Sequence, residues 1–291
     1  MFEGFHQSDI ETDGATIRTL VGGDGPPLLL LHGYPQTHVM WHKIAPKLAD
    51  DYTVVATDLR GYGDSSKPES TADHSLYSFR AMANDQVQVM QHLGFEKFAV
   101  AGHDRGARTA HRMALDHQEA VTKLALLDIV PTLTLYDTAD QKTATSYYHW
   151  YFLIQDFDLP EKMIGSDPEY YLRKKTGHWS AGDCFTEEAM AEYIRCFSDP
   201  ATIHASCEDY RAGASLDLEF DRGDRDAENK ISCPTLVLWG EKGAMGKCYD
   251  VLETWQDKCE TVSGAGLPCG HFLAEEAPDE TYAALSEFFK N

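Results

Sequence analysis

The residues from Phe98 to Arg112 constrain the fold more than any other stretch, because they read as strand, turn and helix in direct succession. Residues 98–101 form a short apolar run, F-A-V-A, which is typical of a buried strand. Apolar residues recur at helical spacing after residue 106. Between them, residues 102–106 read G-H-D-R-G, a G-x-S-x-G nucleophile elbow with Asp104 in place of the serine. The flanking glycines allow a sharp turn, which would lift Asp104 out of the sheet beside the N–H groups of a helix N-terminus.

An aspartate in this position indicates a different reaction from that of a serine. A carboxylate that attacks a saturated carbon leaves an ester, which water can cleave, whereas a serine would leave a stable ether. Asp104 therefore favours displacement at a carbon–halogen bond or at an epoxide. The simpler interpretation is that Asp104 only caps the helix that follows it, and the pentapeptide alone does not decide between the two.

Composition limits the partners of the chain. Its 291 residues suit one large domain, or a core with a smaller insert. The net charge of −22 predicts a surface that repels nucleic acid and anionic membranes. An anionic substrate would need positive charge supplied locally at its binding site.

The chain also lacks the marks of a secreted or membrane protein. No apolar run reaches the ~18 residues of a membrane span, and the first residues do not show the basic and apolar regions of a signal peptide. We therefore expect a cytoplasmic protein whose cysteines are reduced thiols, without disulfides or a zinc site. These cysteines are Cys184, Cys196, Cys207, Cys233, Cys248, Cys259 and Cys269.

Apolar runs that alternate with helical patterns predict a parallel sheet covered on both faces. We expect strands at 15–21, 28–31, 52–56, 98–101, 121–127 and 233–240, with helices at 40–48, 76–93 and 281–290. Three motifs follow strands in order: H-G-Y-P at 32–35, D-x-R-G-x-G-x-S at 58–65 and the elbow. In this order they resemble the α/β-hydrolase fold, and the resemblance covers the whole chain.

Residues 132–211 have no buried-strand pattern and are rich in helix formers and aromatic residues. We interpret them as a helical cap inserted into a core made of residues 1–131 and 212–291. Residues 216–226 read as a charged return linker, and 264–271 as a loop.

The fold that the chain resembles places a histidine base in a loop near the C-terminus and an acid before it in the chain. His271 fits the base, although a loop histidine bonded to the backbone is the alternative. Many members carry the acid in a W-G-x-x-D pattern, but this chain has Gly243 there. Asp128, at the end of a predicted strand, is our candidate instead, with Glu241 and Asp250 as weaker ones. Asp128 could also simply bond the following loop.

Arg105 and Arg108 lie three residues apart at the start of the elbow helix, so they can share one face. Cations there oppose the helix dipole, which calls for a specific role. Bidentate binding of a substrate carboxylate would supply one, and the charges would help to keep Asp104 ionised. The alternative is a pair of surface arginines matched with local acids.

In the predicted cap, residues 147–152 read Y-Y-H-W-Y-F. Indole, imidazole and phenol groups can donate hydrogen bonds to a departing halide. The alternative is that these side chains pack the cap against the core.

With these residues the chain resembles the fluoroacetate dehalogenases. The resemblance rests on H-G-Y-P-Q-T-H-V-M-W-H, G-H-D-R-G-A-R, L-D-I-V-P-T, the His149-Trp150 pair, D-Y-R-A-G and L-P-C-G-H-F. It is specific, because haloalkane dehalogenases usually carry Trp where this chain has Arg105.

The resemblance implies a cytoplasmic homodimer without a cofactor that hydrolyses a small anionic haloacid to a 2-hydroxy acid, as in fluoroacetate to glycolate. Each site residue takes a role by the same similarity. Asp104 would be the nucleophile, His271 the base and Asp128 its partner, while Arg105 and Arg108 would bind the carboxylate. His149, Trp150 and Tyr210 would bind the halide, and the backbone N–H groups of Tyr34 and Arg105 would bind the oxyanion.

The sequence is also compatible with two other functions. An epoxide hydrolase shares the aspartate elbow and uses cap tyrosines to protonate the epoxide, for which Tyr147, Tyr148, Tyr151 and Tyr210 are available. The arginine pair argues against it, since typical epoxides are neutral. A non-catalytic ligand receptor on the same fold is the other alternative, although both nucleophile and base are in place.

Overall fold

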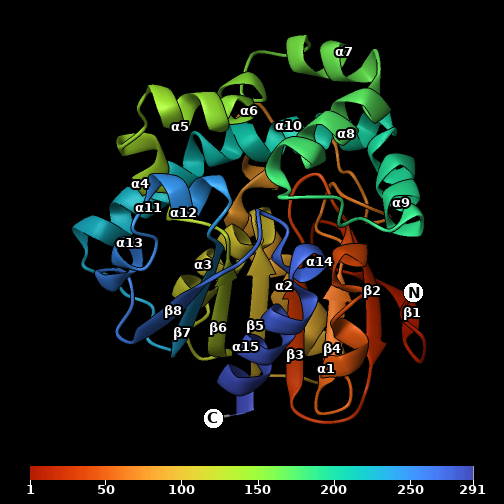
Figure 1. Cartoon of the computed structure of the whole chain (residues 1–291), viewed down its shortest axis with the longest axis vertical. Helices are drawn as coiled ribbons and strands as arrows, with labels where there is room; N and C mark the ends of the chain where they lie inside the picture. Colours follow the sequence, from red (N-terminus) through yellow and green to blue (C-terminus); the bar gives the residue numbers. More distant parts are fainter. Residues whose placement is uncertain (291) are drawn as a thin grey trace.

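The computed structural model describes residues 1–290 and places an eight-stranded sheet at the centre of the molecule (Figure 1). The strand order is β1-β2-β4-β3-β5-β6-β7-β8. The β1–β2 and β2–β4 pairs are antiparallel, and the other pairs are parallel. The predicted α/β class with a mostly parallel sheet is therefore confirmed. The strands are β1 (His6–Glu11), β2 (Thr16–Gly22), β3 (Pro27–Leu31), β4 (Thr53–Thr57), β5 (Phe98–His103), β6 (Val121–Leu127), β7 (Thr235–Gly240) and β8 (Val262–Leu267).

The inner strands bring the chemistry-bearing loops to one edge of the sheet. Leu28–Leu31 in β3 and Leu124–Leu127 in β6 are completely buried, as expected for parallel strands covered on both faces. Strand β5 lies between β3 and β6, with Leu31 opposite Gly102 and Leu127 opposite His103. The loops that follow these three strands therefore begin at the same level.

Helices cover both faces of the sheet (Figure 1). Helices α2 (Phe79–His92) and α3 (Arg105–Asp116) pack against each other on one face. Helices α1 (Ala45–Leu48) and α15 (Pro278–Lys290) contact each other on the opposite face. Shorter elements complete the core: η1 (His38–Trp41), η2 (Ser75–Tyr77), α12 (Ala244–Cys248), α13 (Glu253–Gln256) and α14 (Leu273–Glu276).

Between β6 and β7 the chain forms helices that lie over the carboxyl-terminal edge of the sheet, at the top of Figure 1. Helix α10 crosses above the loops that follow the inner strands and ends slightly beyond residue 211. The helices of this segment are α4 (Thr132–Asp137), α5 (Gln141–Ser146), α6 (Tyr148–Phe152), α7 (Leu159–Gly165), α8 (Pro168–Trp179), α9 (Glu187–Phe197) and α10 (Pro200–Gly213).

Several local predictions were wrong. Residues 216–226 form helix α11 (Leu216–Asp226), not an irregular linker, and residues 264–267 belong to β8 instead of a loop. The expected helix at 40–48 is divided between η1 and α1. Strand β1 was missed because five of its six residues are exposed, so it has no apolar pattern. Strand β8 reads V-S-G-A-G-L and contains two glycines, which lower the strand signal.

Within residues 1–290, no helix is long and apolar enough to cross a membrane. The same part of the chain contains no cluster of three or more His, Cys, Asp or Glu side chains that could hold a metal ion. All seven cysteines are free thiols, as predicted.

Candidate active site

The nucleophile elbow holds Asp104 in a conformation that few non-glycine residues adopt. Asp104 has φ 48° and ψ −115°, between β5 and α3, and it is 1% exposed. A side chain at Gly102 would collide with the backbone of Gly106, and one at Gly106 would collide with the His32 carbonyl. Both glycines are therefore required by close backbone contacts, and the strain at Asp104 is typical of functional positions.

His271 connects two carboxylates at this edge of the sheet. Its Nδ1 lies 2.6 Å from Asp128 Oδ2, and its Nε2 lies 3.8 Å from Asp104 Oδ2. The hydrogen bond to Asp128 places the ring proton on Nδ1, which leaves Nε2 to accept a proton from water. The His271 backbone is held as well, since its carbonyl bonds His103 Nε2 at 2.8 Å and its N–H donates to the Trp179 carbonyl at 3.0 Å.

The structure distinguishes the three candidates for the acid. Asp128 is 1% exposed, and its second oxygen accepts the Gly240 N–H at 2.9 Å. Glu241 is exposed, and Asp250 is exposed and accepts the N–H of Glu253. Asp128 is thus the candidate that hydrogen-bonds His271.

The two oxygens of Asp104 have different surroundings. Oδ1 accepts the Tyr34 backbone N–H at 2.9 Å, whereas Oδ2 lies on the His271 side. Gly33 permits this approach, because a side chain there would collide with Asp104. Arg105 is the first residue of α3, so its N–H has no acceptor within the helix. The Tyr34 side chain lies in the cap wall, where its hydroxyl donates to Tyr171 at 3.2 Å.

The two arginines are both buried but not equivalent. Arg105 donates from Nε to Asp209 Oδ2 at 2.9 Å, and its Nη2 bonds the Asp209 carboxylate and carbonyl. Arg108 bonds the Val130 carbonyl and Thr132 hydroxyl through Nη1, and among residues 1–290 it has no carboxylate partner. Its guanidinium lies 4.4 Å from the centre of the Trp150 ring.

The predicted halide ligands line one wall beside these arginines. His149, Trp150 and Tyr210 are each at most 1% exposed. In the described chain, both His149 ring nitrogens, the Trp150 indole nitrogen and the Tyr210 hydroxyl have no hydrogen-bond partner. Tyr210 contacts both of the others edge to face, at 5.5 and 5.9 Å between ring centres. Buried polar groups are normally hydrogen-bonded, so this cluster of free donors is suited to a ligand.

Electrostatics favours an ionised Asp104 and a neutral His149. Burial would raise the pKa of Asp104, but His271, His103, Arg108 and Arg105 together hold it below its usual value. Burial lowers the pKa of His149 well below its usual value, so the ring is neutral near pH 7. Burial also raises the pKa of Asp128, against the opposing hydrogen bond from His271.

Three further residues lie at the site and were not predicted as members of it. Asp209 neutralises Arg105, Trp179 lies 4.7 Å from the His271 ring centre, and Lys175 is buried one helical turn before Trp179. Asp209 precedes Tyr210 in the D-Y-R-A-G motif, which was a usable signal. Lys175 stands in the run R-K-K, which reads as an exposed helix face.

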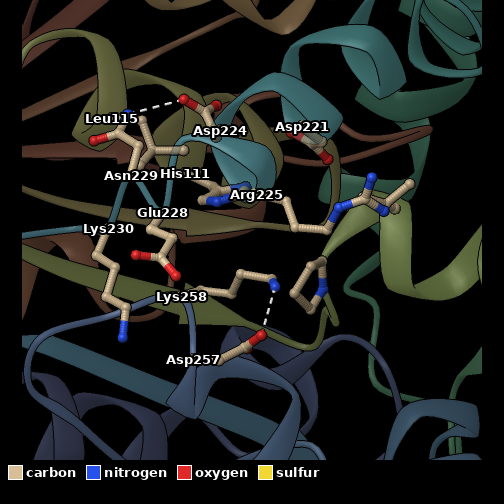
Figure 2. Close-up of a pocket in the computed structure, with 12 residues that line it drawn as sticks. His111, Leu115, Asp221, Asp224, Arg225, Glu228, Asn229, Lys230, Asp257 and Lys258 are labelled. Atoms are coloured by element: carbon tan, nitrogen blue, oxygen red, sulfur yellow. Dashed lines mark hydrogen bonds and ion pairs between the residues drawn. The ribbon is translucent and has the colours of Figure 1, made fainter.

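Two cavities differ in their relation to this site. One, of about 340 Å³, reaches His271 between Tyr147 and Trp179 and has Lys142 and Lys247 on its wall. The other, of about 410 Å³, contains none of the predicted site residues. It lies beside α11 and holds mixed charges, including the Lys258–Asp257 pair (Figure 2).

Three known proteins and one family model resemble this chain over most of its length. The model of the alpha/beta hydrolase fold matches residues 26–278. A fluoroacetate dehalogenase from Burkholderia sp is 47% identical over 100% of this chain and 96% of its own. A soluble epoxide hydrolase from Corynebacterium sp. (strain C12) is 34% identical over 98% of this chain and 96% of its own. The crystal structure of a provisionally assigned alpha/beta hydrolase from Nostoc sp PCC 7120 has a TM-score of 0.98 and 62% identity, covering 99% of both chains.

Proposed function

This chain belongs to the α/β-hydrolase fold family, and we propose that it is a haloacetate dehalogenase that converts fluoroacetate and water into glycolate, fluoride and a proton. The observation that carries the proposal is Arg108, a guanidinium 1% exposed and without a carboxylate partner in residues 1–290, beside the aspartate elbow. A buried cation of this kind calls for an anion. The 47% identity to a fluoroacetate dehalogenase supports the same substrate class.

Substrate binding divides between the two arginines. Arg108 provides the unmatched charge for the substrate carboxylate, and the Trp150 ring lies against its face. The charge of Arg105 is balanced by Asp209. Arg105 therefore orients the substrate carboxylate more than it supplies net positive charge. The α-carbon then lies between Asp104 and the wall formed by His149, Trp150 and Tyr210.

In the first chemical step, Asp104 Oδ2 attacks the α-carbon. The electron pair of the carbon–halogen bond leaves with the halide, and an ester forms on Asp104. Oδ2 is the oxygen suited to attack, because Oδ1 already accepts the Tyr34 N–H. The donors of His149, Trp150 and Tyr210 stabilise the charge that develops on the halogen. Attack from the opposite side predicts inversion at a substituted α-carbon.

In the second step, His271 Nε2 takes a proton from water, whose oxygen attacks the ester carbon of Asp104. The charge then develops on Oδ1, which already lies at the Tyr34 N–H, and the Arg105 N–H is the second donor. Asp128 stabilises the imidazolium. Collapse of the intermediate breaks the bond between the Asp104 carboxyl carbon and Oδ2, and His271 returns its proton to the departing oxygen, which becomes the hydroxyl of glycolate. The oxygen of the water stays in the Asp104 carboxyl group, whose remaining proton passes to solvent and restores the carboxylate.

A fluoride electrode tests the proposal directly. The purified protein should release fluoride from fluoroacetate over many turnovers and chloride from chloroacetate, with no added metal or cofactor. No halide release from either substrate would contradict it. Repeated turnover would also exclude the alternative of a non-catalytic receptor.

Epoxide hydrolysis is the second candidate. The buried Tyr210 hydroxyl, unpaired in the described residues, could protonate an epoxide oxygen, and a soluble epoxide hydrolase is 34% identical. Arg108 favours an anion over a neutral epoxide. Diol formation from a neutral epoxide, faster than halide release from haloacetates, would make this the better assignment.

A homodimer through the cap fits the exposed apolar side chains of α7, α8 and the segment before them. Phe157, Leu159, Met163 and Tyr170 are between 51% and 72% exposed, which is typical of an interaction surface. Light scattering should give twice the 32.5 kDa chain mass, and Met163→Glu should shift the protein toward monomer.

A further inference from the structure

Lys175 is a buried lysine that the proposed reaction has not yet used. It lies in α8 and is 1% exposed, and within residues 1–290 its ammonium has no hydrogen-bond partner. Lysines are almost never fully buried unless they are paired. The preceding residue, Lys174, is exposed on the same helix, so the burial is specific to one position.

The surroundings of Lys175 place it on the halide side of the site. Its Nζ lies 3.7 Å from the Trp179 ring centre. The same Trp179 ring contacts His149 at 4.5 Å and His271 at 4.7 Å between ring centres. After burial, Lys175 is also the strongest influence that lowers the pKa of His149. The ammonium therefore acts at close range on a predicted halide ligand.

In the proposed reaction, neither arginine is free to balance the charge of the departing halide. Arg105 is matched by Asp209, and Arg108 is taken by the substrate carboxylate. When the ester forms, the negative charge of Asp104 passes to the halide. The donors on the halide wall are neutral, since His149 is uncharged near pH 7. A second anion held beside the carboxylate would be unfavourable in this buried space without another positive charge.

We infer that Lys175 supplies this charge, so that it is the cation that stabilises the departing halide from behind His149 and Trp179. The inference rests on the proposed function. Burial lowers the pKa of Lys175 well below its usual value, and the charge of Asp104 opposes that change. A halide held nearby would favour the protonated form in the same way. Lys175 is thus suited to hold its proton most firmly when an anion occupies the site.

The kinetic test compares Lys175→Met with Lys174→Met. Methionine fills a similar volume and removes the charge, and Lys174→Met controls for loss of a lysine from the same helix. Lys175→Met should lower kcat for fluoroacetate about 10- to 100-fold, with a loss of about threefold or less for chloroacetate, because fluoride depends most on stabilisation of the leaving group. Lys174→Met should change neither. Lys175→Arg, which keeps the charge, should recover part of the fluoroacetate rate.

Equal losses for both substrates would overturn the inference, because they would mean that Lys175 only packs against Trp179. Circular dichroism and a thermal melt confirm that each variant is folded. If Lys175→Met does not fold, Lys175→Gln, which also removes the charge, serves as the test with the same two substrates, and equal losses there would also overturn the inference.

Halide binding separates this inference from the proposed function. Trp150 and Trp179 are both within the site, so titration with sodium fluoride or sodium chloride can be followed by tryptophan fluorescence without any turnover. Lys175→Met should raise the halide dissociation constant about tenfold over wild type and Lys174→Met. An unchanged constant would overturn the role of Lys175. Absence of halide release by the wild type, with halide binding dependent on Lys175, would instead overturn the proposed function alone.

Discussion

Two regions of this protein gather polar and charged side chains, and they differ in whether the buried polar atoms have hydrogen-bond partners. In the cavity beside α11, Lys258 bonds Asp257 and Asn229 bonds Asp224, both at 2.8 Å (Figure 2). None of its lining side chains, all within the described residues, has a buried polar atom without a partner.

Around Asp104 the opposite holds. Arg108 has no carboxylate partner in residues 1–290, and the donors of His149, Trp150 and Tyr210 have no acceptor there. The cavity beside α11, at about 410 Å³, is larger than the one of about 340 Å³ that reaches His271. Unmatched buried donors, rather than volume, therefore locate the candidate chemistry in this molecule.

Among substitutions around Asp104, we expect the largest loss of activity at Asp128. Asp128→Asn removes the charge that stabilises the His271 imidazolium, and we expect ester hydrolysis to slow by about 10³- to 10⁴-fold. Single-turnover kinetics would show normal halide release followed by a stalled ester. Glu241→Gln is the matched control, and a larger loss in that variant would mean that Glu241 is the acid.

Within the site, Arg108 differs from Arg105 because it has no carboxylate partner in residues 1–290. Arg108→Met should cost ~2–4 kcal/mol in kcat/KM for haloacetate, because it removes the unmatched charge from a buried carboxylate site. Neutral haloacetamide should lose far less. Equal losses for haloacetate and haloacetamide would show that Arg108 does not bind the carboxylate.

Arg105→Met tests the arginine whose charge is already paired. It leaves Asp209 buried without its partner, so we expect loss of stability as well as activity. A thermal melt beside the haloacetate and haloacetamide assays separates the two effects. An unchanged melting temperature, with a selective loss for haloacetate, would show that Arg105 acts mainly on the carboxylate.

Substitution of the unpaired donors His149, Trp150 and Tyr210 should have a smaller effect, which differs between fluoroacetate and chloroacetate. Trp150→Phe keeps the ring and removes the indole N–H, so the barrier for fluoroacetate should rise by ~2–3 kcal/mol relative to chloroacetate. His149 and Tyr210 variants should change in the same direction. Loss of the same size for both substrates would make Trp150 a packing residue of the cap.

The cavity with paired charges should show the least effect. Lys258→Met breaks a partly exposed ion pair, so kcat/KM should stay within about twofold and stability within about 0.5 kcal/mol. Steady-state kinetics and a thermal melt are sufficient. A tenfold loss of activity would show that this cavity influences the site, and the comparison would then fail.

Sequence reasoning was effective where local geometry determines the outcome. The elbow follows from two glycines and one strand, and the apolar runs of the inner strands were recognised because parallel strands are buried on both faces. Asp128 could be chosen because it follows one of these strands. Strand β1 was not predicted, because its residues are mostly exposed and show no apolar run.

What the sequence could not predict depends on contacts between distant segments. Asp209 pairs with a residue 104 positions away, so the difference between Arg105 and Arg108 arises only after folding. Lys175 is the last residue of the run R-K-K, which reads as an exposed helix face. Its burial is decided by the packing of its ammonium against the Tyr148 and Trp179 rings. These pairings determine which cation remains free for an anion.

In the proposed reaction, Asp104 forms an ester and His271 directs its hydrolysis. His271→Ala should leave the first step intact and block the second, so incubation with chloroacetate or fluoroacetate should trap the intermediate. Mass spectrometry of the digested protein should then show a carboxymethyl group on the peptide that contains Asp104. A carboxymethyl group on another residue, or full turnover by His271→Ala, would contradict the account.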